Sequence, residues 1–148
     1  MKIPPVAQGI VALFLIWLLD RYAPIYHIRF IYQNIVACVF TGAGIIVALL
    51  GVFAFIKLST TVDPRCPEKA NKLVAIDIYK YSRNPMYLGM LLIITGIVIY
   101  FGSLSSIFVI PLFVTYINKY QIVPEEVALK EKFGERYTHY SQNVRRWL

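Results

Sequence analysis

Four long apolar runs divide this chain, and they constrain its fold more strongly than any other feature of the sequence. The runs cover about residues 4–22, 35–58, 85–101 and 104–122. A helix of about 20 apolar residues spans a bilayer and satisfies its own backbone hydrogen bonds there. The hydrophobic content of 58% exceeds the roughly 45–50% that is typical of soluble domains. We therefore expect an all-α polytopic membrane protein with about four transmembrane helices, in a single domain over residues 1–148.

The polar segments complete the predicted topology. Residues 59–84 are expected to form a loop at the membrane surface, and residues 123–148 a polar tail. The first apolar run has the character of a secretory signal, but no small-residue cleavage site follows it, so we expect a retained helix. After Pro124 the sequence becomes charged and amphipathic, which predicts a C-terminal helix lying along the membrane surface.

Two pairs of glycines mark faces for close helix packing. Gly44 and Gly51 lie seven residues apart in the second run, and Gly89 and Gly96 have the same spacing in the third. That spacing returns to one face of a helix, where small residues let a neighbouring backbone approach closely. The pattern predicts packing, either within the chain or between chains.

Basic residues are distributed unequally between the two sides of the predicted bundle. With four spans and both ends inside, only Arg21 and Arg29 of the 15 basic residues fall on the outer side. Because cytosolic segments carry an excess of Lys and Arg, this bias predicts that both termini and both polar segments face the cytosol. Basic residues spread over loops do not favour a nucleic-acid partner, and Cys38 and Cys66 lack metal-ligand spacing. We expect membrane lipids as partners, with no nucleic acid and no metal.

The stretch 79–89 brings polar and aromatic side chains to the start of the third run. It reads Tyr-Lys-Tyr-Ser-Arg-Asn-Pro-Met-Tyr-Leu-Gly. Asn84 is a favoured residue before a helix, and Pro85 suits its first position. The free N–H groups of a helix start bind carboxylates or phosphates, and Arg83 adds a bidentate donor. The stretch therefore predicts a site for an anionic ligand group, beside tyrosine faces that can hold a cation.

A second polar cluster, Glu125-Glu126, follows Pro124. Carboxylates at a helix start are favourable for stability alone. Two adjacent carboxylates beside a membrane can also hold an ammonium group or ribose, or accept a proton from a nucleophile. The sequence contains no Ser-His-Asp set and no Gly-rich phosphate loop, so residue spacing by itself predicts a cytosol-facing polar pocket and leaves both interpretations open.

The order of these motifs resembles the isoprenylcysteine carboxyl methyltransferase and phospholipid methyltransferase family of integral membrane enzymes, and its short bacterial members in particular. The resemblance covers more than half of the chain. It is carried by Thr60-Thr61-Val62, the stretch 79–89, Gly96, Gly102-Ser103, Ile122, Glu125-Glu126, Leu129, Phe133-Gly134, Tyr137, Tyr140 and Val144-Arg145-Arg146-Trp147.

The resemblance implies methyl transfer from S-adenosylmethionine to a hydrophobic or lipid-linked carboxylate, amine or thiol, at the cytosolic face of a bacterial inner membrane. The implied cofactor-binding residues are Tyr79, Arg83, Asn84, Pro85, Tyr87, Gly89, Glu125 and Glu126. Of the two glutamates, Glu125 is the first choice to orient or deprotonate the nucleophile, and Glu126 to face the cofactor. The alternative is a non-catalytic membrane scaffold or carrier that retains the fold.

Three positions depart from the family pattern. Asn84 stands where many members have His, although both can donate a hydrogen bond. Asp77-Ile78 replaces a Gly-Pro pair at the turn before Tyr79. Gln121 stands where members that methylate isoprenylcysteine carry an Arg. The last departure leaves the acceptor open.

Overall fold

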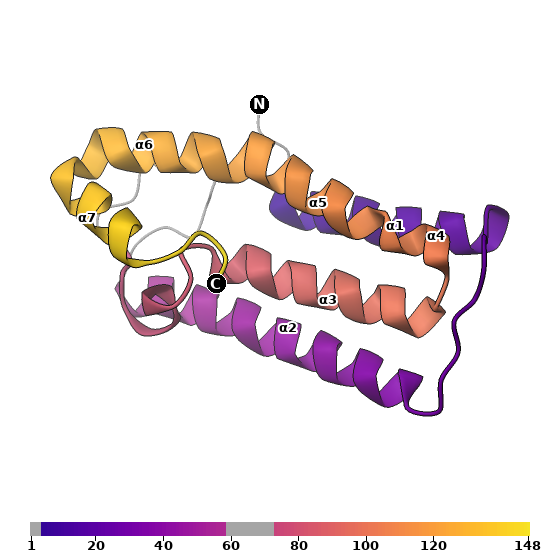
Figure 1. Cartoon of the computed structure of the whole chain (residues 1–148). Coiled ribbons are helices and arrows are strands. Elements are labelled where there is room, and N and C mark those ends of the chain that lie inside the picture. The colour runs from indigo at the N-terminus through magenta and orange to yellow at the C-terminus, as the bar shows by residue number, and fades with distance from the viewer. Residues whose placement is uncertain (1–3, 59–72) are drawn as a thin grey trace.

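The computed structural model describes residues 4–58 and 73–148, which form a bundle of helices (Figure 1). The long helices α1 (Pro5–Tyr22), α2 (Gln33–Lys57) and α3 (Pro85–Phe101) are followed by α4 (Leu104–Ile107), α5 (Val109–Ile117), the π-helical turn η3 (Asn118–Ile122), α6 (Val123–Phe133) and α7 (Glu135–Asn143). A short 3-10 turn, η2 (Asp77–Lys80), precedes α3. No β-strand is present in either described range, which confirms the all-α prediction. The Thr60-Thr61-Val62 motif and Cys66 lie outside the described residues.

The helices follow the apolar runs to within about two residues at most ends. α1, α2 and a continuous helix over Leu104–Phe133 are long and apolar enough to cross a membrane. The fourth apolar helix, α3, has 17 residues. It begins at Pro85 and ends at Phe101, and the left-handed φ of 70° at Gly102 stops the helix there. The chain is therefore a polytopic helical membrane protein.

The glycine faces join α2 to α3 within the chain. A Cβ added to Gly44 would lie 2.6 Å from the carbonyl oxygen of Gly89, and one added to Gly89 would lie 2.6 Å from that of Gly44. A Cβ added to Gly51 would lie 2.7 Å from Met86, and one added to Gly96 would meet Thr41 and, at 2.9 Å, the carbonyl oxygen of Ala37. These contacts answer the question that the spacing left open, because both pairs of glycines serve packing between these two antiparallel helices.

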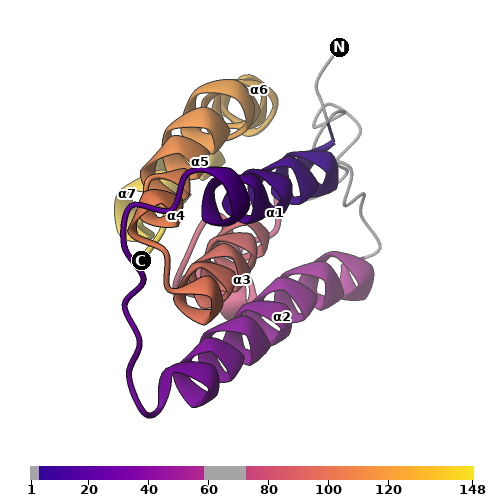
Figure 2. The same ribbon diagram turned by 90° about the vertical axis from the view of Figure 1, so that its right-hand side faces the viewer.

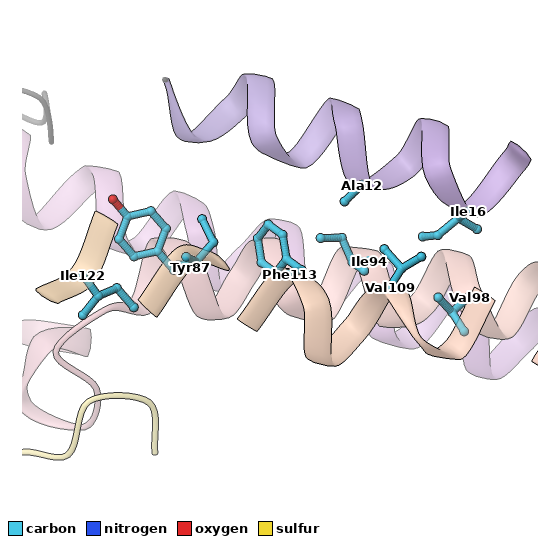
Figure 3. Close-up of a cluster of buried hydrophobic side chains, with 9 residues drawn as sticks. Ala12, Ile16, Tyr87, Ile94, Val98, Val109, Phe113 and Ile122 are labelled. Atoms are coloured by element: carbon cyan, nitrogen blue, oxygen red, sulfur yellow. The ribbon is translucent and has the colours of Figure 1, made fainter. Parts of the chain in front are cut away.

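The apolar core lies on the other side of α3, where it meets α1 and α5 (Figure 2). Buried side chains from the three helices interlock there, as Figure 3 shows; they include Ala12, Ile16, Ile94, Val98, Val109 and Phe113. Tyr87 and Ile122 extend this cluster toward the end of the bundle where α3 begins. α3 is thus the central helix, and its first turn lies where the core meets the polar end.

The region after Pro124 forms the predicted C-terminal helix, but this helix does not begin as a separate element. α6 continues α5 through the π turn, and the chain reverses only at Gly134, with φ 54°. Pro124 has no N–H to bond an earlier carbonyl, and the wider π turn accommodates this because Val123 N–H bonds to the carbonyl of Asn118 instead. The turn at Gly134 sends α7 back toward the start of α3 (Figure 1).

A candidate active site at the start of α3

The approach to α3 is fixed by the buried side chain of Tyr79. Its ring packs edge-on against Phe55 of α2, with centroids 5.5 Å apart, and its carbonyl accepts a hydrogen bond of 2.7 Å from the hydroxyl of Tyr140. Two residues earlier, Asp77 has a left-handed φ of 51°. Aspartate tolerates this conformation better than most residues. Asp77-Ile78 therefore forms the turn before Tyr79, at the position where the resemblance implies a Gly-Pro pair.

Arg83 and Glu126 meet across the site. The Arg83 Nη1 lies 3.2 Å from Oε1 of Glu126, and both side chains are mostly buried, at 14% and 18% exposed. The same Nη1 donates to the hydroxyl of Tyr137 at 3.3 Å. Arg83 Nε is buried and has no hydrogen-bond partner within the described part of the chain. One face of the guanidinium is thus anchored, while Nε still offers a donor.

Tyr87 and Glu125 form the other predicted contact between the two clusters. The Tyr87 hydroxyl donates to Oε1 of Glu125 at 2.6 Å, a short charge-assisted bond. Tyr87 is 4% exposed and belongs to the apolar core cluster, so its ring is fixed by packing. The bond holds Glu125 of α6 at the boundary between the core and the polar end.

The C-terminal segment 144–148, which we call the strap, closes over the start of α3. The backbone N–H of Arg83 donates to the carbonyl of Arg145 at 3.0 Å, and Asn84 Nδ2 donates to the carbonyl of Arg146 at 3.0 Å. Arg146 Nε and Nη2 bond the two oxygens of Glu126 at 3.0 and 2.6 Å. Trp147 packs against the apolar core. The side chain of Asn84 therefore binds the strap. It does not cap its own helix, although Asn before a helix predicted such a cap.

Burial keeps the surrounding tyrosines neutral. It raises the pKa of Tyr79 and of Tyr140 well above the ordinary value of 10.0. The pKa of Tyr137 is raised as well, first by burial and then by the nearby Glu126 carboxylate. These hydroxyls remain protonated donors at neutral pH. The hydrogen bonds to Glu126 raise the pKa of Arg146, whose guanidinium stays charged.

The structure brings most of the predicted site residues together, but in different ways. Arg83, Tyr87, Glu125 and Glu126 converge through side chains. The remaining predicted residues are nearby in the fold: Tyr79 and Asn84 through backbone and strap contacts, Pro85 as the buried first residue of α3, and Gly89 one turn later against Gly44 of α2. Their contact with a methyl donor stays a prediction.

Sequence reasoning missed Arg146, Tyr137 and Tyr140 as members of the cluster. These residues entered the sequence analysis only among those that carry the family resemblance, and it gave them no place in the site. Residue spacing carries no information on which carboxylate an arginine reaches, because the contact from Arg146 to Glu126 spans 20 residues of chain. The only local signal was the proximity of Arg145-Arg146 to an aromatic anchor, Trp147.

Fold and site together define a helical membrane protein with a polar, carboxylate-containing site at one end of its central helix. Residues 32–136 match the phospholipid methyltransferase family, and this match covers more than half of the chain. The chain belongs to that family, which indicates a membrane methyltransferase. An uncharacterized protein of Haemophilus influenzae is 41% identical over 63 residues, which are 43% of this chain and 100% of that protein. No solved structure matches the chain.

Proposed function

We propose that this protein transfers a methyl group from S-adenosylmethionine to a hydrophobic or lipid-linked acceptor at the cytosolic face of the membrane. One observation carries the proposal: the two motif segments, 83–87 and 125–126, meet at one end of the bundle through two side-chain contacts, Arg83 with Glu126 and Tyr87 with Glu125. Both segments lie inside the region that matches the methyltransferase family.

The residues present suit this methyl donor. Its amino-acid carboxylate requires a cationic donor, and Arg83 Nε is a buried donor with no partner among the described residues. The start of α3 adds backbone N–H groups and the positive end of the helix dipole. Its amino and ribose groups require acceptors, and the Glu126 carboxylate supplies one beside Arg83. When bound, the sulfonium supplies an activated methyl group, so the protein has to orient and desolvate the two reactants.

We assign different tasks to the two glutamates. Both oxygens of Glu126 are bonded by arginine guanidinium groups, so this carboxylate is fixed and suits the binding of the donor. Glu125 is held by the Tyr87 hydroxyl at the edge of the apolar core. A carboxylate at that depth is placed to orient an acceptor that enters from the bilayer and to take its proton. This assignment keeps Glu125 as the first choice for the catalytic role.

The acceptor side of the site is uncharged where isoprenylcysteine enzymes have an arginine. Gln121 is 1% exposed and lies in the π turn, four residues before Glu125. A neutral amide provides hydrogen bonds but no charge for a substrate carboxylate. This difference favours an acceptor that does not depend on a guanidinium partner, and it leaves lipid amines and thiols as the first classes to test.

The sidedness rests on charge. Lys57 at the end of α2 and Arg83 before α3 lie at the same end of the bundle as α6 and α7, whereas the connection from α1 to α2, which carries Arg29, lies at the opposite end (Figure 1). The excess of positive charge at the site end supports a cytosolic active site and cytosolic termini, in agreement with the water-soluble donor that must reach it.

The test is calorimetric titration of the detergent-solubilised protein with S-adenosylmethionine. We expect binding by the wild type and its loss in the double variant Arg83→Ala, Glu125→Ala. Equal titration curves for the two proteins would favour a scaffold or carrier that retains the fold without the reaction. A second assay, with radiolabelled methyl donor and a membrane lipid extract, identifies the chemical class of the acceptor.

A further inference from the structure

The strap lies over the start of α3, next to the candidate site. Its backbone carbonyls at Arg145 and Arg146 receive hydrogen bonds from the two residues that precede α3. Trp147 packs on the core. These three contacts hold the strap in place without the side chain of Arg146, which is therefore available for another task.

That side chain makes the most extensive contact of Glu126. Nε and Nη2 bond Oε1 and Oε2 in parallel, at 3.0 and 2.6 Å, and this two-point geometry restricts the carboxylate to one orientation. Oε1 also faces Arg83 Nη1 at 3.2 Å. Two guanidinium groups thus share one carboxylate. The orientation of Arg83, and with it the direction of its unpartnered Nε, depends on where Arg146 holds Glu126.

We propose that Arg146 is a positioning residue of the methyltransferase site: it holds Glu126, and through Glu126 it sets Arg83 in the geometry that receives the methyl donor. This inference rests on the proposed function. The family match covers residues 32–136, and the sequence resemblance that extends to Val144-Arg145-Arg146-Trp147 gave Arg146 no role. The assignment therefore comes from the contacts of Arg146 with Glu126. Arg146 is expected to act on binding of the donor more than on the acceptor, because Glu125 and Tyr87 form a separate contact.

The neighbouring arginine provides a matched control. Arg145 has an exposed side chain and contributes to the strap through its backbone carbonyl, which an alanine variant retains. Arg145→Ala and Arg146→Ala remove the same charge from adjacent positions of the same segment. Arg146→Lys keeps the charge and loses the two-point geometry. Comparison of these variants thus separates the effect of net charge in the strap from the effect of the two-point contact with Glu126.

The experiment measures the dissociation constant of S-adenosylmethionine by calorimetry, together with KM for the donor and kcat. In Arg146→Ala we expect the dissociation constant and the donor KM to rise about tenfold with a smaller change in kcat, as for loss of one partly exposed charge-assisted pair. Arg146→Lys should recover part of the affinity, and Arg145→Ala should stay within about twofold of wild type. In a Glu126→Gln background, Arg146→Ala should have little further effect, because its action passes through Glu126.

Tryptophan fluorescence distinguishes positioning from simple loss of the strap. Trp17 and Trp147 are the two tryptophans of the chain, so Trp17→Phe leaves Trp147 as the reporter of strap docking. We expect unchanged emission in Arg146→Ala. A red-shifted emission with lost binding would overturn positioning in favour of a structural role. Binding by the wild type with equal binding by Arg146→Ala would overturn this inference alone, whereas absence of binding by the wild type would remove the proposed function and the inference with it.

Discussion

The two surfaces of α3 that meet α2 and the strap are built in opposite ways. Toward α2, the helix presents glycines whose backbones nearly touch the neighbouring helix, and a Cβ at Gly44 or Gly89 would lie within 2.6 Å of a carbonyl oxygen. At its first turn, the same helix meets polar groups of segments that lie 38 to 62 residues further along the chain. The first surface depends on the absence of side chains, and the second on their length.

This contrast indicates that the rigid part of the bundle supports the polar part. Gly51 packs on Met86 and Pro85, so the α2 to α3 contact continues to the first turn of α3, next to Arg83. A close backbone contact has little freedom to shift, because packed interiors do not deform continuously. The polar residues can then be placed by hydrogen bonds of 2.6 to 3.3 Å on a frame that is already fixed. Substitutions in the two regions should therefore have different effects: loss of folded protein at the glycine surface, and loss of ligand binding at the polar end.

The largest effect is expected at the glycine surface. Gly44→Leu places a side chain against the backbone of Gly89 and Ile93, which cannot retract, so we expect a loss of about 3 kcal/mol or more and little folded protein. Gly42→Leu is the matched control on the same helix, because a Cβ at Gly42 meets nothing within 4 Å. Size-exclusion profiles and thermal unfolding in detergent measure the difference. Equal behaviour of the two variants would contradict the packing of α2 on α3.

A smaller loss of stability is expected at the polar end. Glu126→Gln leaves the guanidinium groups of Arg83 and Arg146 without a counter-charge, which we expect to cost roughly 2 kcal/mol after allowance for partial exposure. Glu131→Gln, at an exposed position of the same helix, should change stability by less than about 0.5 kcal/mol. Unlike Gly44→Leu, the Glu126→Gln variant should keep its fold and lose binding of the methyl donor. Unaltered binding in Glu126→Gln would show that this carboxylate has no part in the site.

Tyr87→Phe removes one hydroxyl at the boundary between the two regions. The ring remains packed, so we expect a loss of about 1.5 kcal/mol from the charge-assisted bond to Glu125. If Glu125 orients the acceptor, kcat should fall about tenfold, with donor affinity nearly unchanged. Tyr81→Phe is the control, since the Tyr81 side chain is 75% exposed. A fall in donor affinity equal to the fall in kcat would move Glu125 from the acceptor to the donor side.

The contrast between the regions also explains what the sequence predicts. The start of α3 at Pro85 and the seven-residue glycine spacing follow from local rules of helix starts and helix faces, and the structure has both. The pairing of Glu125 with Tyr87, and of Glu126 with Arg83, spans long stretches of chain and was accessible only through the ordered motifs of a family. Arg146 was not predicted, because the route of the strap depends on the reversal at Gly134 and on the docking of α7. The continuation of α6 was also missed, since proline is ordinarily a sign that a helix begins or ends.

The smallest predicted effect is a gain in stability, and it concerns Asn118 in the π turn η3. Asn118 Oδ1 is buried and has no hydrogen-bond partner in residues 4–58 or 73–148, and an unsatisfied polar atom is costly within a membrane helix. Asn118→Leu should therefore raise the free energy of unfolding by up to about 1 kcal/mol. Thr115→Leu, at an exposed position one turn earlier, is the control for added apolar surface.

Kinetic measurements on Asn118→Leu test whether the Asn118 side-chain oxygen has a role in the reaction. Asn118 lies one helical turn before Gln121 and Ile122, which are buried, and two turns before Glu125, so its amide continues the polar line of the site toward the apolar core. If the oxygen accepts a hydrogen bond from the acceptor, Asn118→Leu should be more stable and also raise the KM for the acceptor several-fold, while the donor constant stays the same. A more stable variant with unchanged kinetics would indicate that the π turn only accommodates Pro124 and has no part in binding the acceptor. A less stable variant would mean that the amide is part of the packing, as the glycines are.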